Sequence, residues 1–126
     1  MQAPKRPKIL VIDDEQVIAD TLAKILDING YDASPVYSGL AAIESARELR
    51  PDLIISDVIL EVGTMNGIEA VIKIRDFLPS CKILLFSGQA VTADLLEDAR
   101  SQGHNFEIVA KPVHPTELLA KLKMAG

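Results

Sequence analysis

Three short and almost wholly apolar runs, each followed by a polar residue, constrain the fold of this chain most strongly. The runs cover residues 9–12, 53–56 and 83–86, and Asp13, Asp57 and Ser87 follow them. Runs of this length suit strands that are buried on both faces, as in parallel sheets. Segments with apolar residues at helical spacing separate the runs. Strands that alternate with helices predict a parallel sheet covered by helices on both sides.

Two weaker runs complete the predicted sheet, at residues 31–37 and 106–109. The first contains Pro35, which has no backbone N–H for a strand ladder, and the second carries polar residues. Both features are typical of edge strands. With these two runs at the edges, the sequence predicts the strand order 2-1-3-4-5. This is a flavodoxin-like, doubly wound α/β fold with five strand–helix units.

Length and charge limit the possible functions. A chain of 126 residues is expected to form a single domain over residues 1–126, with a flexible basic segment at 1–7 and no output domain. The net charge of -5 argues against direct nucleic-acid binding, and the single cysteine cannot form an internal disulfide. No apolar run approaches the roughly 20 residues of a membrane span. We therefore expect a cytoplasmic location and no membrane partner.

Polar residues at the strand ends form the candidate site. In doubly wound sheets, ligands bind beyond the carboxyl ends of the strands, where the strand order reverses. Asp13, Asp14 and Asp57 follow the first and third strands, whereas Ser87 and Lys111 follow the fourth and fifth. Three carboxylates this close repel one another unless a cation lies among them, and Mg²⁺ or Mn²⁺ suits such oxygen ligands. A carboxylate neutralised in this way can attack phosphorus, and an ammonium group would stabilise the transferred charge.

The order of these residues resembles that of a known family. Asp13-Asp14, Asp57, Ser87 and Lys111-Pro112 each follow the expected strand, and with them the chain resembles the CheY-like receiver domain of two-component response regulators over nearly its whole length. The resemblance implies that Asp57 accepts a phosphoryl group from a sensor histidine kinase or a histidine phosphotransfer protein. It also implies that Asp14, Asp57 and the backbone carbonyl of Ile59 bind the metal directly, while Asp13 acts through a metal-bound water.

The same resemblance assigns roles to the remaining residues. Ser87 would be the switch hydroxyl, Lys111 would pair with the phosphoryl group, and the Lys111–Pro112 bond would be cis. The chain would not be an enzyme in the usual sense, because phosphoryl transfer and slow autodephosphorylation would be self-catalysed. It would act through an unknown output protein, and it could form a homodimer, as some relatives do.

Three features depart from the family's pattern. The loop from Val58 to Gly67 is longer than usual and lacks a proline. Ile108 occupies the position of the usual switch aromatic, and Phe106, two residues earlier on the same face of the strand, is a candidate substitute. Apolar Ile59 occupies a position that influences hydrolysis of the aspartyl phosphate, so we expect it to prolong the phosphorylated state.

Several alternatives remain open. Asp13 and Asp14 could cap the first helix. The chain could also be a receiver-like interaction module that no longer depends on phosphorylation. A hydrolase with an aspartyl nucleophile is less favoured, because Ile59 stands where such enzymes carry a second acid. Flavin or nucleotide binding on the same fold would need a phosphate-binding loop rich in glycine, but Asp13-Asp14-Glu15 stands there instead.

Overall fold

The structure is a computed structural model that describes residues 6–58, 60, 65–87, 92–104, 106–110 and 114–125. Five parallel strands form one sheet in the order β2-β1-β3-β4-β5, which confirms the predicted topology. The strands are β1 (Lys8–Ile12), β2 (Asp32–Val36), β3 (Leu53–Asp57), β4 (Lys82–Ser87) and β5 (Glu107–Ala110).

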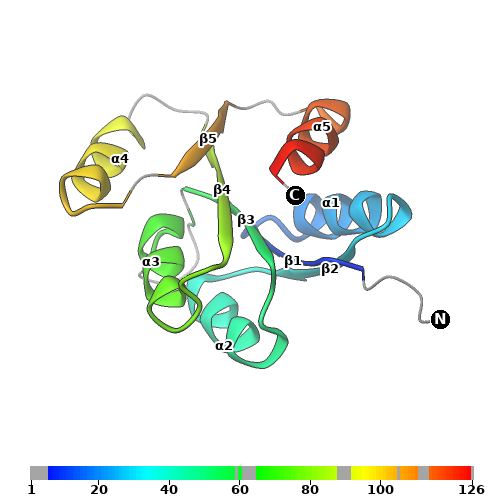
Figure 1. Ribbon diagram of the computed structural model, residues 1–126, viewed down its shortest axis with the longest axis horizontal. Helices are drawn as coiled ribbons and strands as arrows, with labels where there is room; N and C mark the ends of the chain where they lie inside the picture. The colour runs from blue at the N-terminus through cyan, green and yellow to red at the C-terminus, as the bar shows by residue number, and fades with distance from the viewer. Residues whose placement is uncertain are drawn as a thin grey trace.

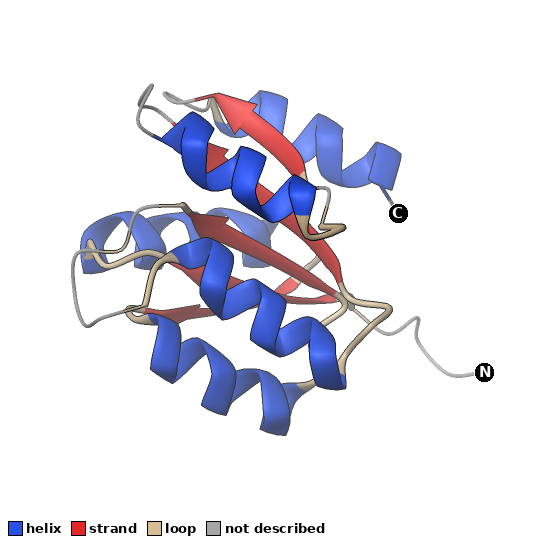
Figure 2. Ribbon diagram, turned by 90° about the vertical axis from the view of Figure 1, so that its left-hand side faces the viewer, coloured by secondary structure: helices blue, strands red, loops and turns tan. Residues whose placement is uncertain are grey.

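The helices cover both faces of the sheet. They are α1 (Gln16–Ile28), α2 (Gly39–Leu49), α3 (Gly67–Phe77), α4 (Thr92–Ser101) and α5 (Pro115–Ala125). Figure 1 shows α1 and α5 on one side of the sheet and α2, α3 and α4 on the other. Figure 2 looks onto the side that carries the second group, with the strands behind. No helix in these described ranges is long and apolar enough to cross a bilayer.

Two hydrophobic cores lie on the two faces because successive strand residues point in opposite directions. In β1, Leu10 and Ile12 face α2 and α3, whereas Ile9 and Val11 face α1 and α5. The first core includes Ala42, Ala46, Ile54, Ile68, Val71, Ile74 and Leu85, and the second includes Ala19, Leu26, Ile55, Leu84, Phe86, Val109, Leu118 and Leu122. The central strands are therefore buried on both faces, as their apolar composition predicts.

Side-chain caps define where two helices on the same face begin. Ser38 Oγ accepts a hydrogen bond from the backbone N–H of Ala41 at the start of α2. At the start of α3, Asn66 and Glu69 form a reciprocal capping box. Caps of this kind stabilise a helix by about 1 kcal/mol and fix its first residue. They position Gly39 and Gly67, the first residues of α2 and α3.

The β2 edge accepts Pro35 as expected, since β2 pairs only with β1 along the sheet. The end of the expected flexible segment is tied to this edge. The Arg6 guanidinium donates to the backbone carbonyl of Asp27, and the backbone N–H of Asp32 donates to the carbonyl of Pro7 at 2.9 Å. Residues 6 and 7 therefore continue the packing of β1, while residues 1–5 lie outside the described ranges.

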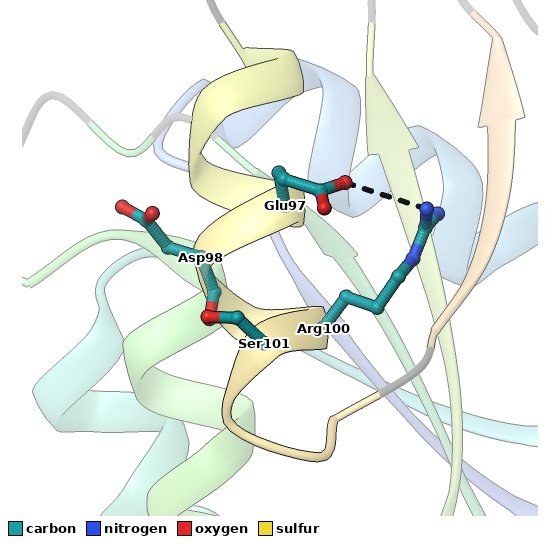
Figure 3. A network of polar contacts seen from close by, with 4 residues as sticks. All are labelled: Glu97, Asp98, Arg100 and Ser101. Atoms are coloured by element: carbon teal, nitrogen blue, oxygen red, sulfur yellow. Dashed lines mark hydrogen bonds and ion pairs between the residues drawn. The ribbon is translucent and has the colours of Figure 1, made fainter.

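The outer face of α4 is polar. Glu97 and Arg100 form an ion pair at 3.4 Å, and Ser101 Oγ donates to the backbone carbonyl of Asp98 at 2.7 Å (Figure 3). The side chains of the ion pair are 69% and 67% exposed, so it adds at most about 1 kcal/mol to stability. The helix is instead anchored to the sheet by its buried face, where Ala99 is 3% exposed.

The Cys81 thiol should react slowly in the folded protein. The pKa of the thiol is raised to about 11, mainly because the thiol is buried; the Asp52 carboxylate adds to the rise, and Arg75 opposes it. We expect iodoacetamide to alkylate native Cys81 roughly a hundredfold more slowly near neutral pH than the urea-unfolded chain. Because this pKa exceeds the ordinary value of 9.0, the free energy of unfolding falls as the pH rises from about 9 through 11. Equal alkylation rates with and without urea would contradict the prediction, and mass spectrometry measures both.

Candidate functional site

Three carboxylates meet at the carboxyl edge of the sheet. Oxygen atoms of Asp13, Asp14 and Asp57 all lie within 4.8 Å of one another. Asp13 and Asp14 directly follow β1, and Asp57 is the last residue of β3, which pairs with β1. Parallel pairing therefore brings together side chains that are more than forty positions apart in the sequence. We call these three residues the acidic trio.

Asp13 is held in place by the backbone. Its side chain is buried, with 5% exposure of the residue, and its Oδ1 accepts a hydrogen bond from the backbone N–H of Glu15 at 3.0 Å. The Asp13 N–H donates to the carbonyl of Val36 in β2 at 3.1 Å. The N-cap residue of α1 is Glu15, which makes no side-chain cap bond. The N-cap position of the first helix is therefore Glu15, and Asp13 contributes at the helix start only through its bond to the Glu15 N–H.

The start of α3 packs closely against the backbone of Asp57. The Gly67 N–H donates to the carbonyl of Val58 at 2.9 Å, and the Val58 N–H donates to the carbonyl of Phe86 in β4 at 3.1 Å. A Cβ atom on Gly67 would lie 1.9 Å from the Asp57 carbonyl oxygen and 2.8 Å from Ser56 Oγ. The helix can therefore approach the Asp57 backbone this closely only with glycine at its first position.

Ser87 ends β4 beside Asp57. It is half-buried and pairs with Ala110, the last residue of β5. Its hydroxyl therefore belongs to the same sheet edge as the acidic trio. Three of the predicted site residues, Ile59, Lys111 and Pro112, lie outside the described residues, as does most of the long loop after Asp57. Lys111 directly follows Ala110 in the sequence.

The two candidate switch residues, Ile108 on β5 and Phe106 just before it, lie in different surroundings. Ile108 pairs with Leu85 and is 37% exposed. Phe106 instead directly precedes β5. At the usual rise per residue of a strand, it lies about 13 Å from Ala110 at the other end of β5. Its ring lies under the Arg75 guanidinium at 5.0 Å and stacks on His104 at 6.2 Å. This location disfavours Phe106 as a substitute for the switch aromatic, because Ser87 lies at the other end of the sheet.

The donor set of the acidic trio fits a hard divalent cation. At an effective dielectric near 20, two carboxylate charges 4.8 Å apart repel by at least about 3 kcal/mol. A cation among them removes this repulsion, and carboxylate oxygens are the ligands that Mg²⁺ and Mn²⁺ prefer. Asp14 and Asp57 are half-buried, so water retains access to complete the coordination.

Comparisons with known proteins agree with this geometry. The family model described as the response regulator receiver domain matches residues 9–123. The chain belongs to this family. The DNA-binding response regulator MtrA of Mycobacterium tuberculosis is 32% identical over 120 residues, which cover 94% of this chain and 50% of that protein. The chain thus spans about half the length of this relative.

Two chemotaxis proteins match over most of their own length. The chemotaxis protein CheY of Thermotoga maritima is 28% identical over 116 residues, covering 91% of this chain and 93% of that protein. The structure of the chemotaxis response regulator CheY4 of Vibrio cholerae superposes with a TM-score of 0.82 at 27% identity, covering 97% of this chain and all of that one. The receiver fold is therefore shared throughout the described chain.

Two residues that support the receiver site were not predicted from the sequence. Gly67 was considered only as the end of the long loop, and Ser56 only as the last residue of an apolar run. Ser56 is fully buried, and its Oγ donates to the Asp57 carbonyl at 2.9 Å. The sequence did contain a signal for Ser56, because it is a hydroxyl residue in an otherwise apolar strand and directly precedes Asp57.

Proposed function

We propose that this receiver domain is switched by phosphorylation of Asp57, with a histidine kinase or a histidine phosphotransfer protein as donor. The observation that supports the proposal is the meeting of the three carboxylates within 4.8 Å at the carboxyl edge. Receiver domains act as signalling switches rather than as enzymes in the usual sense. The output protein is a partner that binds one of the two states.

The transfer is a displacement at phosphorus. An Asp57 carboxylate oxygen attacks the phosphorus of the donor phosphohistidine, a P–O bond forms, and the P–N bond breaks. The electron pair of that bond stays on the imidazole nitrogen, which takes up a proton from solvent. A divalent cation, when bound, neutralises negative charge on the transferred group. Asp14, Asp57 and the Ile59 carbonyl would hold it directly, and Asp13 through a water.

Ser87 and Lys111 would act after the transfer. The Ser87 hydroxyl would donate a hydrogen bond to a phosphoryl oxygen on Asp57, and its position at the end of β4 supports this role. Lys111 follows β5 and would pair with another phosphoryl oxygen, aided by a cis bond to Pro112. Both contacts would be stronger when Asp57 carries the negatively charged phosphoryl group, so they would favour the phosphorylated conformation.

An exposed apolar surface adjoins the site. Val17 and Ile18, in the first turn of α1, are 78% and 43% exposed. They follow Asp14 closely in the chain, so a protein that brings its phosphohistidine to Asp57 could cover them. Exposed apolar side chains beside a reactive group are typical of a protein interaction site.

Mg²⁺ will be required for binding of beryllofluoride, a phosphoryl mimic. Adding both to the protein should shift the backbone amide resonances of Asp57 and Ser87, because the mimic adds charge beside them. Chelation by EDTA should reverse the shifts. Asp14→Asn should weaken Mg²⁺ binding by about tenfold or more, since one charged ligand is lost. Isothermal titration calorimetry measures the affinity.

The control is Asp76→Asn, an exposed residue near the end of α3. It should leave Mg²⁺ affinity unchanged. If the wild-type protein shows no shift with Mg²⁺ and beryllofluoride, the proposal fails, and the alternative of a phosphorylation-independent interaction module takes its place.

A further inference from the structure

A pocket lies at the opposite end of the sheet from the acidic trio. Its volume is about 230 Å³, and its wall includes Leu53, Lys82 and Glu107, the first residues of β3, β4 and β5. Asp57 and Ser87 are the last residues of β3 and β4. The pocket and the trio are therefore separated by the full length of the strands, about 13 Å or more. The function proposed above assigns no role to this pocket.

Positive charge surrounds the pocket. Arg75 of α3, Lys82 of β4 and Lys121 of α5 contribute three cationic groups, against the Glu107 carboxylate in the wall and the Asp52 carboxylate directly before Leu53. Lys121 Nζ lies 3.3 Å from Glu107 Oε1, and both side chains are largely exposed, so solvent weakens this ion pair. Such an excess of cations stands out in a chain whose net charge is -5. The local field therefore favours an anion.

Arg75 has an unsatisfied donor. Its guanidinium lies over the Phe106 ring at 5.0 Å, which restricts the plane of the group. Its Nε is buried and has no hydrogen-bond partner within the part of the chain that the structure describes. More than nine in ten buried polar groups in native proteins have a partner. Arg75 also lines the pocket, so we expect the rest of its guanidinium to attract an oxygen-rich ligand there.

The pocket is amphipathic. Leu84 and Leu122, which both belong to the core beside α1 and α5, form a buried apolar floor, with exposures of 3% and 5%. Lys82 and Glu107 are more exposed. The volume is smaller than the roughly 300–1,000 Å³ of pockets that hold drug-sized ligands. It therefore suits a small molecule with its charge at one end and an apolar body at the other.

We propose that this pocket binds a small organic phosphate monoester. Its doubly charged head lies among Arg75, Lys82 and Lys121, and its apolar ester group contacts the floor. Arginine and lysine are the usual partners of phosphate oxygens. A dicarboxylate fits less well, because its second charge would face Leu84 and Leu122. The proposal does not depend on phosphorylation of Asp57.

Titration of the 126-residue chain with phenyl phosphate tests this assignment. The experiment is followed by two-dimensional amide NMR with EDTA present, so that no metal occupies the acidic trio. We expect saturable shifts at the backbone amides of Lys82, Glu107 and Lys121. Lys121→Gln should weaken binding roughly tenfold, because it removes a charged donor. Glu107→Gln should strengthen binding several-fold, because it removes the opposing carboxylate and releases Lys121.

The matched control is Lys123→Gln, an exposed lysine on the same helix that does not line the pocket. It should leave the affinity unchanged. Equal weakening by Lys121→Gln and Lys123→Gln, or no saturable shift at millimolar phenyl phosphate, would overturn the proposal. Succinate binding as tightly as phenyl phosphate would overturn the assigned ligand class. Inorganic phosphate binding equally tightly would overturn the role of the apolar floor.

Discussion

Asp57→Asn will abolish incorporation of label from radiolabelled acetyl phosphate, by roughly two orders of magnitude or more. The amide lacks the anionic oxygen that attacks phosphorus, and it is a poorer ligand for the divalent cation. The wild-type protein should incorporate label only when Mg²⁺ is present. The measurement is the stoichiometry of label that hydroxylamine removes from the protein, as expected of an acyl phosphate, determined over a time course by gel autoradiography.

The design of this experiment separates loss of chemistry from loss of fold. Asp76→Asn makes the same chemical change on an exposed part of α3 and should label at the wild-type rate. The Asp57→Asn variant should retain the circular dichroism spectrum of the wild type, since relief of carboxylate repulsion does not destabilise the fold. Label that persists in Asp57→Asn would place the acceptor on another residue.

Gly67→Ala will destabilise the domain by about 3 kcal/mol or more. The added methyl group would lie 1.9 Å from the Asp57 carbonyl oxygen, which is a backbone atom of a central strand and cannot rotate away. Either α3 must shift or β3 must bend at its last residue. Urea unfolding followed by circular dichroism gives the free-energy difference, and the surviving folded fraction should label slowly because Asp57 is displaced.

Gly39→Ala is the matched comparison. Gly39 is also the first residue of a capped helix, but the three atoms nearest to a Cβ there all belong to the Met65 side chain, at 3.2 Å. The methionine side chain can adjust, and alanine favours helix more than glycine does. We expect a change of less than about 1 kcal/mol. Equal destabilisation by the two substitutions would show that the contact with Asp57 is not the cause.

The fold was predictable from the sequence because its signals are local and agree with one another. Apolar runs of strand length identified the central strands, and Pro35 identified an edge. The strand order then brought Asp13, Asp14 and Asp57 to one edge without further information. The acidic trio is therefore a consequence of topology, and the structure places it as predicted.

Other parts of the site depend on tertiary packing, which leaves no local pattern in a single sequence. The close approach of Gly67 to Asp57 arises from the angle at which α3 meets β3, and many glycines that begin helices have no such contact. Phe106 lies outside β5 because the strand begins at Glu107. The alternation of side chains along a strand, which suggested Phe106 as a substitute, does not determine where the strand begins. The pocket beside Arg75 forms between α3, α5 and three strand ends, so no local pattern marks it.

The gathering of acids at one end of the sheet has a consequence for how the domain meets other molecules. Asp13, Asp14 and Asp57 concentrate negative charge at the carboxyl edge, whereas the strand starts carry both signs, with Lys8 and Lys82 offset by Asp32 and Glu107. Until a cation binds, the carboxyl edge therefore attracts positively charged groups and repels negatively charged ones. The effect of this attraction on the association rate falls as ionic strength rises.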